Sequence, residues 1–257
     1  MHPEEIRSIV GSTPHTPPDR GQVLYEFIKQ HRLARCLELG FAHGVGTVWL
    51  AGAVRALGGG KVIAVDNQSA LKRTPSAREL VQRAGLEELV ELHFDSLSYT
   101  WHLQRHLASY MQQPFDFVFI DGAHTWDTDG FAFFLVEKLL RPGGWIVFDD
   151  LNWTYAGSPS LRETELVRSM TDEYKNTPQV RMVWESLVLQ HPQFGNFIED
   201  EFWGWSQKVL SPGDTRQLEI RTVSRSLPER IMRKLRGVAA RRSSWNRQSR
   251  LSHRAKV

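Results

Sequence analysis

Acidic side chains and a histidine directly follow two apolar runs of the sequence. FDFVFI at 115–120 leads into IDGAH with Asp121 and His124, and GWIVF at 144–148 leads into Asp149 and Asp150. If the two runs are neighbouring parallel strands, they lie about 4.8 Å apart and three carboxylates crowd one corner of the sheet. Such crowding is unfavourable unless a cation or a proton relieves it. Hard oxygen ligands suit Mg²⁺, Ca²⁺ or Mn²⁺, and the alternative is that these acids cap the helices that follow.

His124 stands three residues after Asp121, so both belong to the candidate catalytic group. A histidine can accept a proton from a hydroxyl group near neutral pH. Two other roles stay open, which are binding of the metal and a hydrogen bond within its own loop. The sequence therefore predicts a site for hydroxyl chemistry at this corner.

The stretch LELGFAHGVGT at 37–47 contains Gly40, Gly44 and Gly46 between an apolar run and a helical pattern. The spacing fits neither the dinucleotide-binding fingerprint nor a P-loop, because no lysine follows Gly46. Glycines here allow the backbone to approach a ligand closely, and the start of the following helix offers free N–H groups to a carboxylate. The alternative is a glycine-rich turn that binds nothing.

Further acids end the predicted strands on this side of the chain. Asp66 ends KVIAVD and can accept hydrogen bonds from two ribose hydroxyls. Asp95 and Ser96 end the next run and could bond an adenine amine, and Glu38 could orient the glycine loop or bind an ammonium. Together these acidic side chains predict an adenosine ligand without a phosphate group, because they would repel a phosphate.

Five apolar, β-prone runs recur at steps of 26 to 29 residues, which leaves room for one helix and two loops between strands. We predict an α/β fold: a Rossmann-like, doubly wound sheet of five parallel strands closed by an antiparallel pair, with a basic C-terminal extension. Helical composition covers 48–57, 76–84, 131–140 and, as an amphipathic helix, 161–174. The parallel runs are 35–39, 61–65, 89–93, 115–120 and 144–148, and the antiparallel pair is 186–190 and 204–209.

The motifs ELGFAHGVGT, VIAVD, FDFVFIDGAH and LRPGGWIVFDD together resemble the class I S-adenosylmethionine-dependent methyltransferases. The resemblance covers roughly residues 20–210 and is greatest to the small-molecule O-methyltransferases of the macrocin and cephalosporin-hydroxylase-like branch. It implies S-adenosylmethionine as cofactor and Mg²⁺ as an additional ligand. The positions it assigns to the cofactor are Glu38, Gly40, Gly44, Gly46, Asp66 and Asp95, and to the metal Asp121, Asp149 and Asp150. We also expect Ser96 and Asp121 to contact the cofactor.

Charge is unevenly distributed along the 257 residues, whose formal net charge is +3. The segment from Arg225 to Val257 carries 11 Lys and Arg against one acid, so the rest of the chain is acidic. We expect a lid segment at 1–20, a methyltransferase domain at 21–210 and a basic tail at 225–257 that is helical and then disordered. The tail could contact a membrane surface peripherally, and no nucleic acid is expected as a partner.

The single cysteine, Cys36, fits a reducing compartment, and no signal-peptide core or membrane span is evident, so a cytoplasmic protein is expected. Nine tryptophans are many for this length, and those near the acidic corner, such as Trp126 and Trp153, would suit a pocket for a sugar or secondary metabolite. The predicted function is methyl transfer to a hydroxyl of a small-molecule acceptor, by a chain that could be a homo-oligomer. The alternatives are an RNA-modifying methyltransferase recruited by the tail and a non-catalytic S-adenosylmethionine-binding module.

Overall fold

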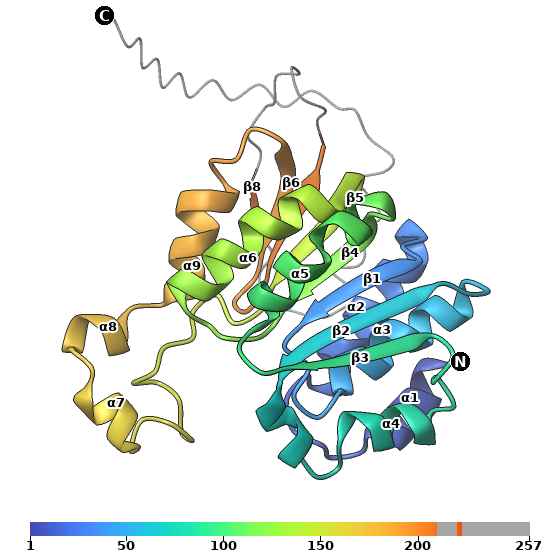
Figure 1. Cartoon of the computed structure of the whole chain (residues 1–257), viewed down its shortest axis with the longest axis horizontal. Helices are drawn as coiled ribbons and strands as arrows, with labels where there is room; N and C mark the ends of the chain where they lie inside the picture. Colours follow the sequence, from blue (N-terminus) through green and yellow to red (C-terminus); the bar gives the residue numbers. More distant parts are fainter. Residues whose placement is uncertain (210–219, 223–257) are drawn as a thin grey trace, which may run out of the picture.

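The computed structural model describes residues 1–209 and 220–222. Within them the strands form one sheet in the order β3-β2-β1-β4-β5-β7-β6-β8 (Figure 1). β7 is antiparallel to both of its neighbours, and the other paired strands are parallel. The strands are β1 (Arg35–Leu39), β2 (Lys61–Asn67), β3 (Val90–Asp95), β4 (Phe115–Ile120), β5 (Leu140–Phe148), β6 (Phe194–Glu199), β7 (Gly204–Lys208) and β8 (Ile220–Thr222).

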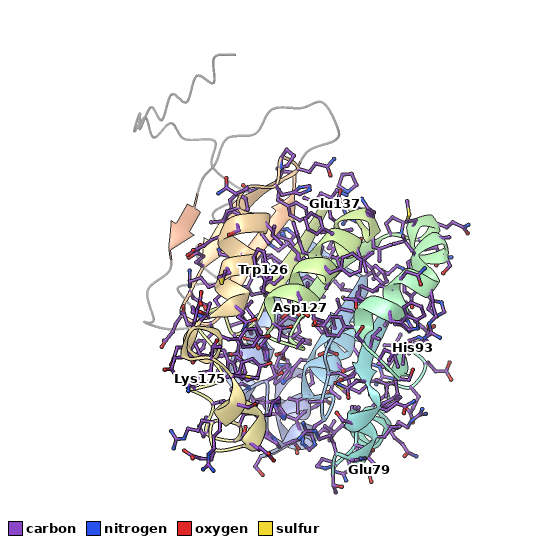
Figure 2. All side chains as sticks on the ribbon, turned by 60° about the vertical axis from the view of Figure 1, so that its left-hand side comes forward. Glu79, His93, Trp126, Asp127, Glu137 and Lys175 are labelled. Carbon is purple, nitrogen blue, oxygen red and sulfur yellow. The ribbon has the colours of Figure 1, made fainter. Side chains whose placement is uncertain are left out.

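The order of the strands confirms the predicted five-strand parallel series and the antiparallel closure, and it adds β8 beside β6. From β1 the chain first builds outward through β2 to β3, and it then returns to place β4 on the other side of β1. The order therefore reverses between β1 and β4, which is where open α/β sheets bind ligands at the carboxyl ends of their strands. β3 forms one edge of the sheet, where His93 is labelled in Figure 2.

Helices cover both faces of the sheet, with α5, α6 and α9 on one face and α2 and α3 on the other (Figure 1). The longer helices are α1 (Pro3–Val10), α2 (Pro18–His31), α3 (Val45–Ala56), α4 (Ala77–Arg83), α5 (Tyr99–Gln112) and α6 (Trp126–Leu139). The short ones are η1 (Gln68–Lys72), α7 (Glu165–Ser169), α8 (Asp172–Asn176), α9 (Gln179–Val183) and the π-helical turn η2 (Trp184–Val188).

Successive strand residues point to opposite faces and so join different cores. On β1, Cys36 packs with the core under α2 and α3, whereas Leu37 packs with the core under α5 and α6. On β4, Phe117 and Phe119 belong to the first core, and Val118 to the second. Burial of apolar residues on both faces explains why these strands read as continuous apolar runs in the sequence.

The strand predicted at 186–190 is wrong, because this segment belongs to the helical turn η2 and its end, and β6 begins only at Phe194. Trp184 is buried against Phe148 and Phe197, and Val188 is buried as well. A short apolar run of this kind does not reveal its period, so a buried helical turn and a strand look alike in sequence.

The single helix expected over 161–174 is two short ones, α7 and α8. Thr171 separates them because its side chain accepts a hydrogen bond from the backbone N–H of Tyr174 and so begins a new helix. No helix within the described residues has both the length and the apolar character needed to cross a bilayer. The predicted basic tail at 225–257 lies outside the described residues.

At the N-terminus, α1 packs onto α3 through buried Ile6 and Val10. Residues 11–17 then lead to α2 and bring His15 and Thr16 to the cavity described below. The role of the 1–20 segment as a lid stays a prediction.

Candidate active site

The glycine loop joins the end of β1 to α3 and fits tightly against its neighbours. Gly40 has φ +88°, and a Cβ placed there would overlap the backbone of Asp121 and Gly122. Its N–H also donates to the carbonyl of Val65, at 2.8 Å. Gly40 is therefore the point where the carboxyl ends of β1, β2 and β4 meet, and only a residue without a side chain fits there.

The other two glycines of the motif are not among the residues that line the cavity. Gly44 has φ +83° and begins α3, and a Cβ on it would lie 2.7 Å from the Cβ of Ala77 on α4. A Cβ on Gly46 would overlap the carboxyl group of Glu38. In this structure both glycines permit close packing beneath the loop, whereas Gly40 lines the cavity itself.

Asp66 holds the glycine loop in place. Its Oδ2 accepts hydrogen bonds from the backbone N–H groups of Phe41 and Ala42, at 2.9 and 2.8 Å. Ala42 has φ +46°, a left-handed conformation that these bonds help to maintain. Each carboxylate oxygen has more than one lone pair, so Asp66 can still accept bonds from a ligand in the cavity that it lines.

Glu38 lies beneath the loop and is almost fully buried. The hydroxyl of Thr47 on α3 donates a hydrogen bond to its Oε2. Burial raises the pKa of Glu38 to about 8, the Thr47 bond partly opposes this shift, and the nearby charge of Asp66 adds to it. Glu38 is thus a largely protonated carboxyl group at neutral pH, one that a bound ammonium would ionise.

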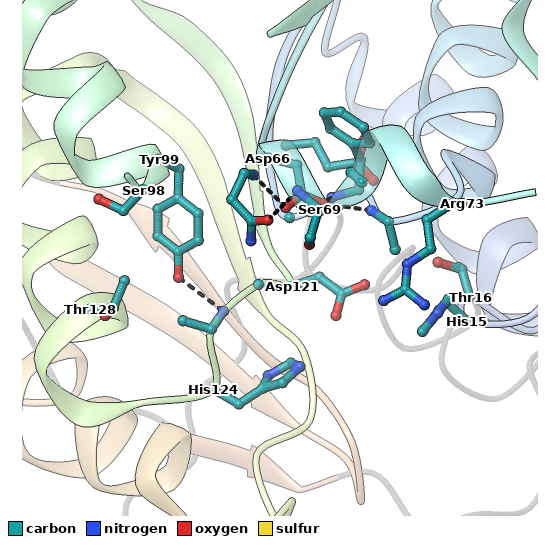
Figure 3. Close-up of a pocket in the computed structure, with 18 of the residues that line it drawn as sticks. His15, Thr16, Asp66, Ser69, Arg73, Ser98, Tyr99, Asp121, His124 and Thr128 are labelled. Atoms are coloured by element: carbon teal, nitrogen blue, oxygen red, sulfur yellow. Dashed lines mark hydrogen bonds between the residues drawn. The ribbon is translucent and has the colours of Figure 1, made fainter. Parts of the chain in front are cut away.

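These side chains surround a cavity of about 330 Å³ at the carboxyl ends of the parallel strands (Figure 3). A volume in this range suits a small-molecule ligand. Of the residues predicted from sequence, Glu38, Gly40, Asp66, Asp121 and His124 line it. Lining residues that the sequence did not indicate include His15, Thr16, Asn67, Ser69, Arg73, Ser98, Tyr99 and Thr128.

Asp95 and Ser96, predicted to contact adenine, are not among the lining residues. Asp95 is buried and forms an ion pair with Arg105 of α5, while Ser96 is exposed. The next residues in the chain, Leu97 and Ser98, line the cavity instead. The adenine contact expected of Asp95 and Ser96 stays a prediction.

At the opposite corner, Asp121, His124 and Asp150 converge. One potential ligand atom from each lies within 4.8 Å of the others, and His124 Nε2 is 3.9 Å from Asp150 Oδ2. His124 and Asp150 have φ of +55° and +57°. These two residues, which are neighbours in space, both have a left-handed backbone conformation although neither is glycine. Such energetically unfavourable conformations are common at functional sites.

The carboxylate of Asp149, which was predicted to bind a metal, already accepts hydrogen bonds from other groups of the protein. Its Oδ1 accepts bonds from Arg20 Nη1, at 3.2 Å, and from the backbone N–H of Asp150, at 2.7 Å. Burial and the charge of Asp150 raise the pKa of Asp149 to about 7, against the lowering effect of Arg20. Burial, followed by the charges of Asp149 and Asp150, also raises the pKa of Asp121 well above its usual range.

A buried tyrosine fixes the backbone that carries Asp121 and His124. The Tyr99 hydroxyl donates to Asp129 and accepts from the N–H of Ala123, at 3.1 Å. Asp129 in turn accepts from the N–H of Thr125, at 3.1 Å. This pair cannot be recognised in the sequence, because a tyrosine at the start of α5 and an aspartate inside α6 form no known motif.

Aromatic residues near the site divide into two groups. The ring of Trp153 lies 5.1 Å from that of His124, between ring centroids, and Tyr155 continues the contact at 4.8 Å. Trp203 and Trp205 are instead buried in the core under α2 and α3. Trp153 and Tyr155 can therefore extend the wall of the site beyond His124, whereas Phe41 and Tyr99 line the cavity itself.

Comparison with known proteins agrees with this geometry. Residues 37–151 match a family described as a methyltransferase domain. A comparison with curated proteins gave no match. Among solved structures, the O-methyltransferase TomG from Streptomyces achromogenes is similar with 20% identity over 81% of this chain and 89% of that one, at a TM-score of 0.57.

Two further structures are similar to a comparable extent. The O-methyltransferase from Bacillus cereus, in complex with S-adenosylhomocysteine, has 23% identity over 80% of this chain and 90% of that one, at a TM-score of 0.56. A Podospora anserina methyltransferase has 14% identity over 80% and 86%, at 0.55. Residues 37–151 therefore match a methyltransferase domain, and the chain has the fold of these methyltransferase structures.

Proposed function

We propose that the protein transfers a methyl group from S-adenosylmethionine to a hydroxyl oxygen of a small molecule. The observation that carries the proposal is the cavity itself, which joins the glycine loop and Asp66 on one side to Asp121 and His124 on the other. The match to a methyltransferase domain over the same residues supports it. So do the O-methyltransferases among the similar structures.

The cavity fits this cofactor on chemical grounds. Gly40 lines the cavity with backbone alone, and Asp66 lines it with a carboxylate that can accept hydrogen bonds from ribose hydroxyls. Glu38 and Asp121 add two more carboxyl groups, which favour an ammonium and disfavour a phosphate. A nucleoside that carries an amino acid but no phosphate is the ligand class that agrees with all of these groups.

The bound cofactor would supply a methyl group on a sulfonium centre, activated for displacement. The protein's own contribution is then to orient an acceptor oxygen and to receive its proton, which accounts for much of the acceleration in such reactions. His124 is placed for proton transfer, because it lines the cavity and lies 3.9 Å from Asp150, which can stabilise the protonated ring.

A divalent cation fits the same corner. Asp121, Asp150 and His124 supply two carboxylates and one ring nitrogen. Burial and the charges of Asp149 and Asp150 raise the pKa of Asp121, so a cation bound beside it would stabilise its charged form. A cation held there would position a hydroxyl and make its proton easier to remove. His124 then has two candidate roles, as ligand or as proton acceptor.

Calorimetric titration of the full chain with S-adenosylhomocysteine tests the cofactor assignment. We expect binding that Asp66→Asn weakens by about 1–3 kcal/mol, since the amide keeps one acceptor oxygen for the loop but loses the charge. Absence of both binding heat and thermal stabilisation in the unmodified protein would remove the proposal.

Incorporation of radiolabelled methyl groups into separated cell fractions tests the acceptor class. Label in the small-molecule fraction supports the proposal, label in RNA supports the nucleic-acid alternative, and cofactor binding without any label supports a binding module. His124→Asn keeps a residue that tolerates the left-handed conformation. If His124 is the proton acceptor, this variant loses turnover and keeps stabilisation by Mg²⁺.

A further inference from the structure

Basic side chains gather on one side of the cavity, and the methyl-transfer chemistry proposed above does not use them. His15 comes from the segment between α1 and α2, and Arg73 follows η1. The ring of His43, from the glycine loop, lies 5.6 Å from that of His15 between centroids. Figure 3 shows the Arg73 guanidinium beside His15 and Thr16, turned toward the cavity.

Arg73 differs from other arginines near the site in having no acidic partner. Arg20 pairs with Asp149, and Arg105 pairs with Asp95. Among the described residues no carboxylate lies within 4.0 Å of the Arg73 guanidinium, although carboxyl groups line the same cavity. A guanidinium is always charged and presents several donors in one plane, which matches a carboxylate or a phosphate.

The backbone at His15 supports a role for this ring. His15 has φ +78°, an uncommon conformation for a residue other than glycine, and this conformation presents its side chain to the cavity. Burial, Arg73 and His43 lower the pKa of His15. Its protonation is thus disfavoured until a negative charge arrives, so an anion would bind together with a proton.

The cavity lining therefore carries groups of both signs. Glu38, Asp66 and Asp121 supply carboxyl groups, and His15 and Arg73 supply basic groups. We propose that Arg73 and His15, with the Thr16 hydroxyl beside them, form a subsite for an anionic group, a carboxylate or a phosphate, of a ligand bound in the cavity.

The anionic group could belong to either of two ligands. If the proposed function holds, one source is the carboxylate of the cofactor's amino-acid part, and the subsite then deepens that function. The other source is an acid group on the methyl acceptor. The chemistry recognised is the same, so separate binding measurements must distinguish the two sources.

Arg73→Gln is the test variant, and Lys72→Gln is its matched control. Lys72 is the preceding residue, also exposed, and it does not line the cavity, so its replacement removes the same charge from nearly the same place. Calorimetry uses S-adenosylhomocysteine and 5′-methylthioadenosine, which share the thioadenosine part and differ in the amino-acid part.

For the cofactor source, Arg73→Gln weakens S-adenosylhomocysteine about tenfold or more, as expected for a charge-assisted bond, and leaves 5′-methylthioadenosine unchanged. For the acceptor source, both nucleosides bind unchanged. Inorganic phosphate then stabilises the S-adenosylhomocysteine complex of the unmodified protein and of Lys72→Gln, but not of Arg73→Gln. His15→Asn, which tolerates the same backbone conformation, should show a smaller loss of about threefold in the same measurement.

The subsite is overturned if Arg73→Gln and Lys72→Gln give the same affinities for both nucleosides and the same response to phosphate. Failure of the proposed function looks different, because then neither nucleoside binds the unmodified protein. In that case phosphate alone decides: Arg73-dependent thermal stabilisation supports the anionic subsite, and its absence in the unmodified protein overturns it.

Discussion

Two corners of one cavity, at the ends of β1 and β2 and at the ends of β4 and β5, are built in opposite ways. At the first corner the carboxylate of Asp66 is stabilised within the protein, because it accepts hydrogen bonds from the N–H groups of Phe41 and Ala42. At the second, Asp121, Asp149 and Asp150 crowd together, and burial raises the pKa of both Asp121 and Asp149. The first corner is a loop held by hydrogen bonds, and the second is a group of buried carboxyl groups whose negative charges repel one another.

The difference suggests a division of labour. A loop already held by hydrogen bonds can bind a ligand without losing further conformational freedom on binding. A corner with too much negative charge gains from a cation, a proton or a developing positive charge. Binding and chemistry would then lie at the ends of neighbouring strands, β1 and β4.

The largest effect on stability and binding is expected at Gly40, where the two corners are in contact. Gly40→Ala would place a Cβ into the backbone of Asp121 and Gly122, at φ +88°. We expect a loss of roughly 3 kcal/mol or more in the free energy of unfolding, and loss of S-adenosylhomocysteine binding. Urea unfolding and calorimetry measure the two quantities.

Gly58→Ala is the control for this change. Gly58 also has a positive φ, of +96°, but a Cβ there would meet nothing within 4 Å. It should cost only the conformational penalty of about 1–2 kcal/mol and leave ligand binding intact. Equal effects of both substitutions would mean that the two corners do not depend on close contact at Gly40.

Sequence alone predicted the backbone of both corners well. The runs 35–39 and 115–120 coincide with β1 and β4, because strands buried on both faces are continuous apolar segments. Acids at the ends of such strands necessarily fall at one edge of the sheet. Glu38, Asp66, Asp121 and His124 accordingly line the same cavity, and their roles there stay predictions.

What the sequence did not reveal depends on contacts between distant segments. Asp95 meets Arg105 across a turn, and Asp149 meets Arg20 from a helix that lies 129 residues earlier. Tyr99 supports the backbone after β4 through a bond that no spacing rule describes. Residues that hold a site therefore escape sequence reasoning more easily than residues that end a strand.

Loosening the second corner alone should have an intermediate effect. Tyr99→Phe keeps the ring against Gly122 but removes the hydroxyl that bonds Asp129 and the N–H of Ala123. Two buried groups lose a partner, so we expect a loss of about 1–3 kcal/mol in unfolding free energy. S-adenosylhomocysteine should also bind several-fold more weakly, because the Asp121 segment loses its support.

Tyr110→Phe provides the comparison for this variant. Its hydroxyl contacts His102 Nε2 at 3.0 Å, and Tyr110 does not line the cavity. A similar loss of stability with unchanged nucleoside affinity is expected. If Tyr99→Phe behaves in the same way, Tyr99 supports the fold and not the site.

The unfavourable charge of the buried Asp149 carboxylate at the second corner should appear in the pH dependence of the free energy of unfolding. The pKa of Asp149 is raised to about 7, so between its ordinary value near 3.8 and pH 7 the folded protein binds more protons than the unfolded chain. Stability from this group therefore falls as the pH rises through that window. Asp149→Asn cannot ionise, so the urea midpoint of this variant should rise relative to that of the unmodified protein as the pH increases from about 4 to about 7. No relative gain would show that Arg20 already neutralises Asp149.

A smaller effect of opposite sign is expected at the sheet edge, away from both corners. His102 on α5 is buried, and its ring lies 4.6 Å from that of His93 and 4.4 Å from that of His106, between centroids. Burial and these two histidines lower its pKa to about 4, against the opposing effect of Asp95. The unfolded chain then binds more protons between pH 6.5 and 4, so stability is lost as the pH falls through that range, by up to about 3 kcal/mol. His102→Gln should flatten the acid side of the stability profile and leave the Asp149 response above pH 5 unchanged. If His102→Gln also altered that response, protonation of His102 at the sheet edge would be coupled to protonation of Asp149 at the second corner. The unfavourable charge beside Asp121 would then not be a local property of the site.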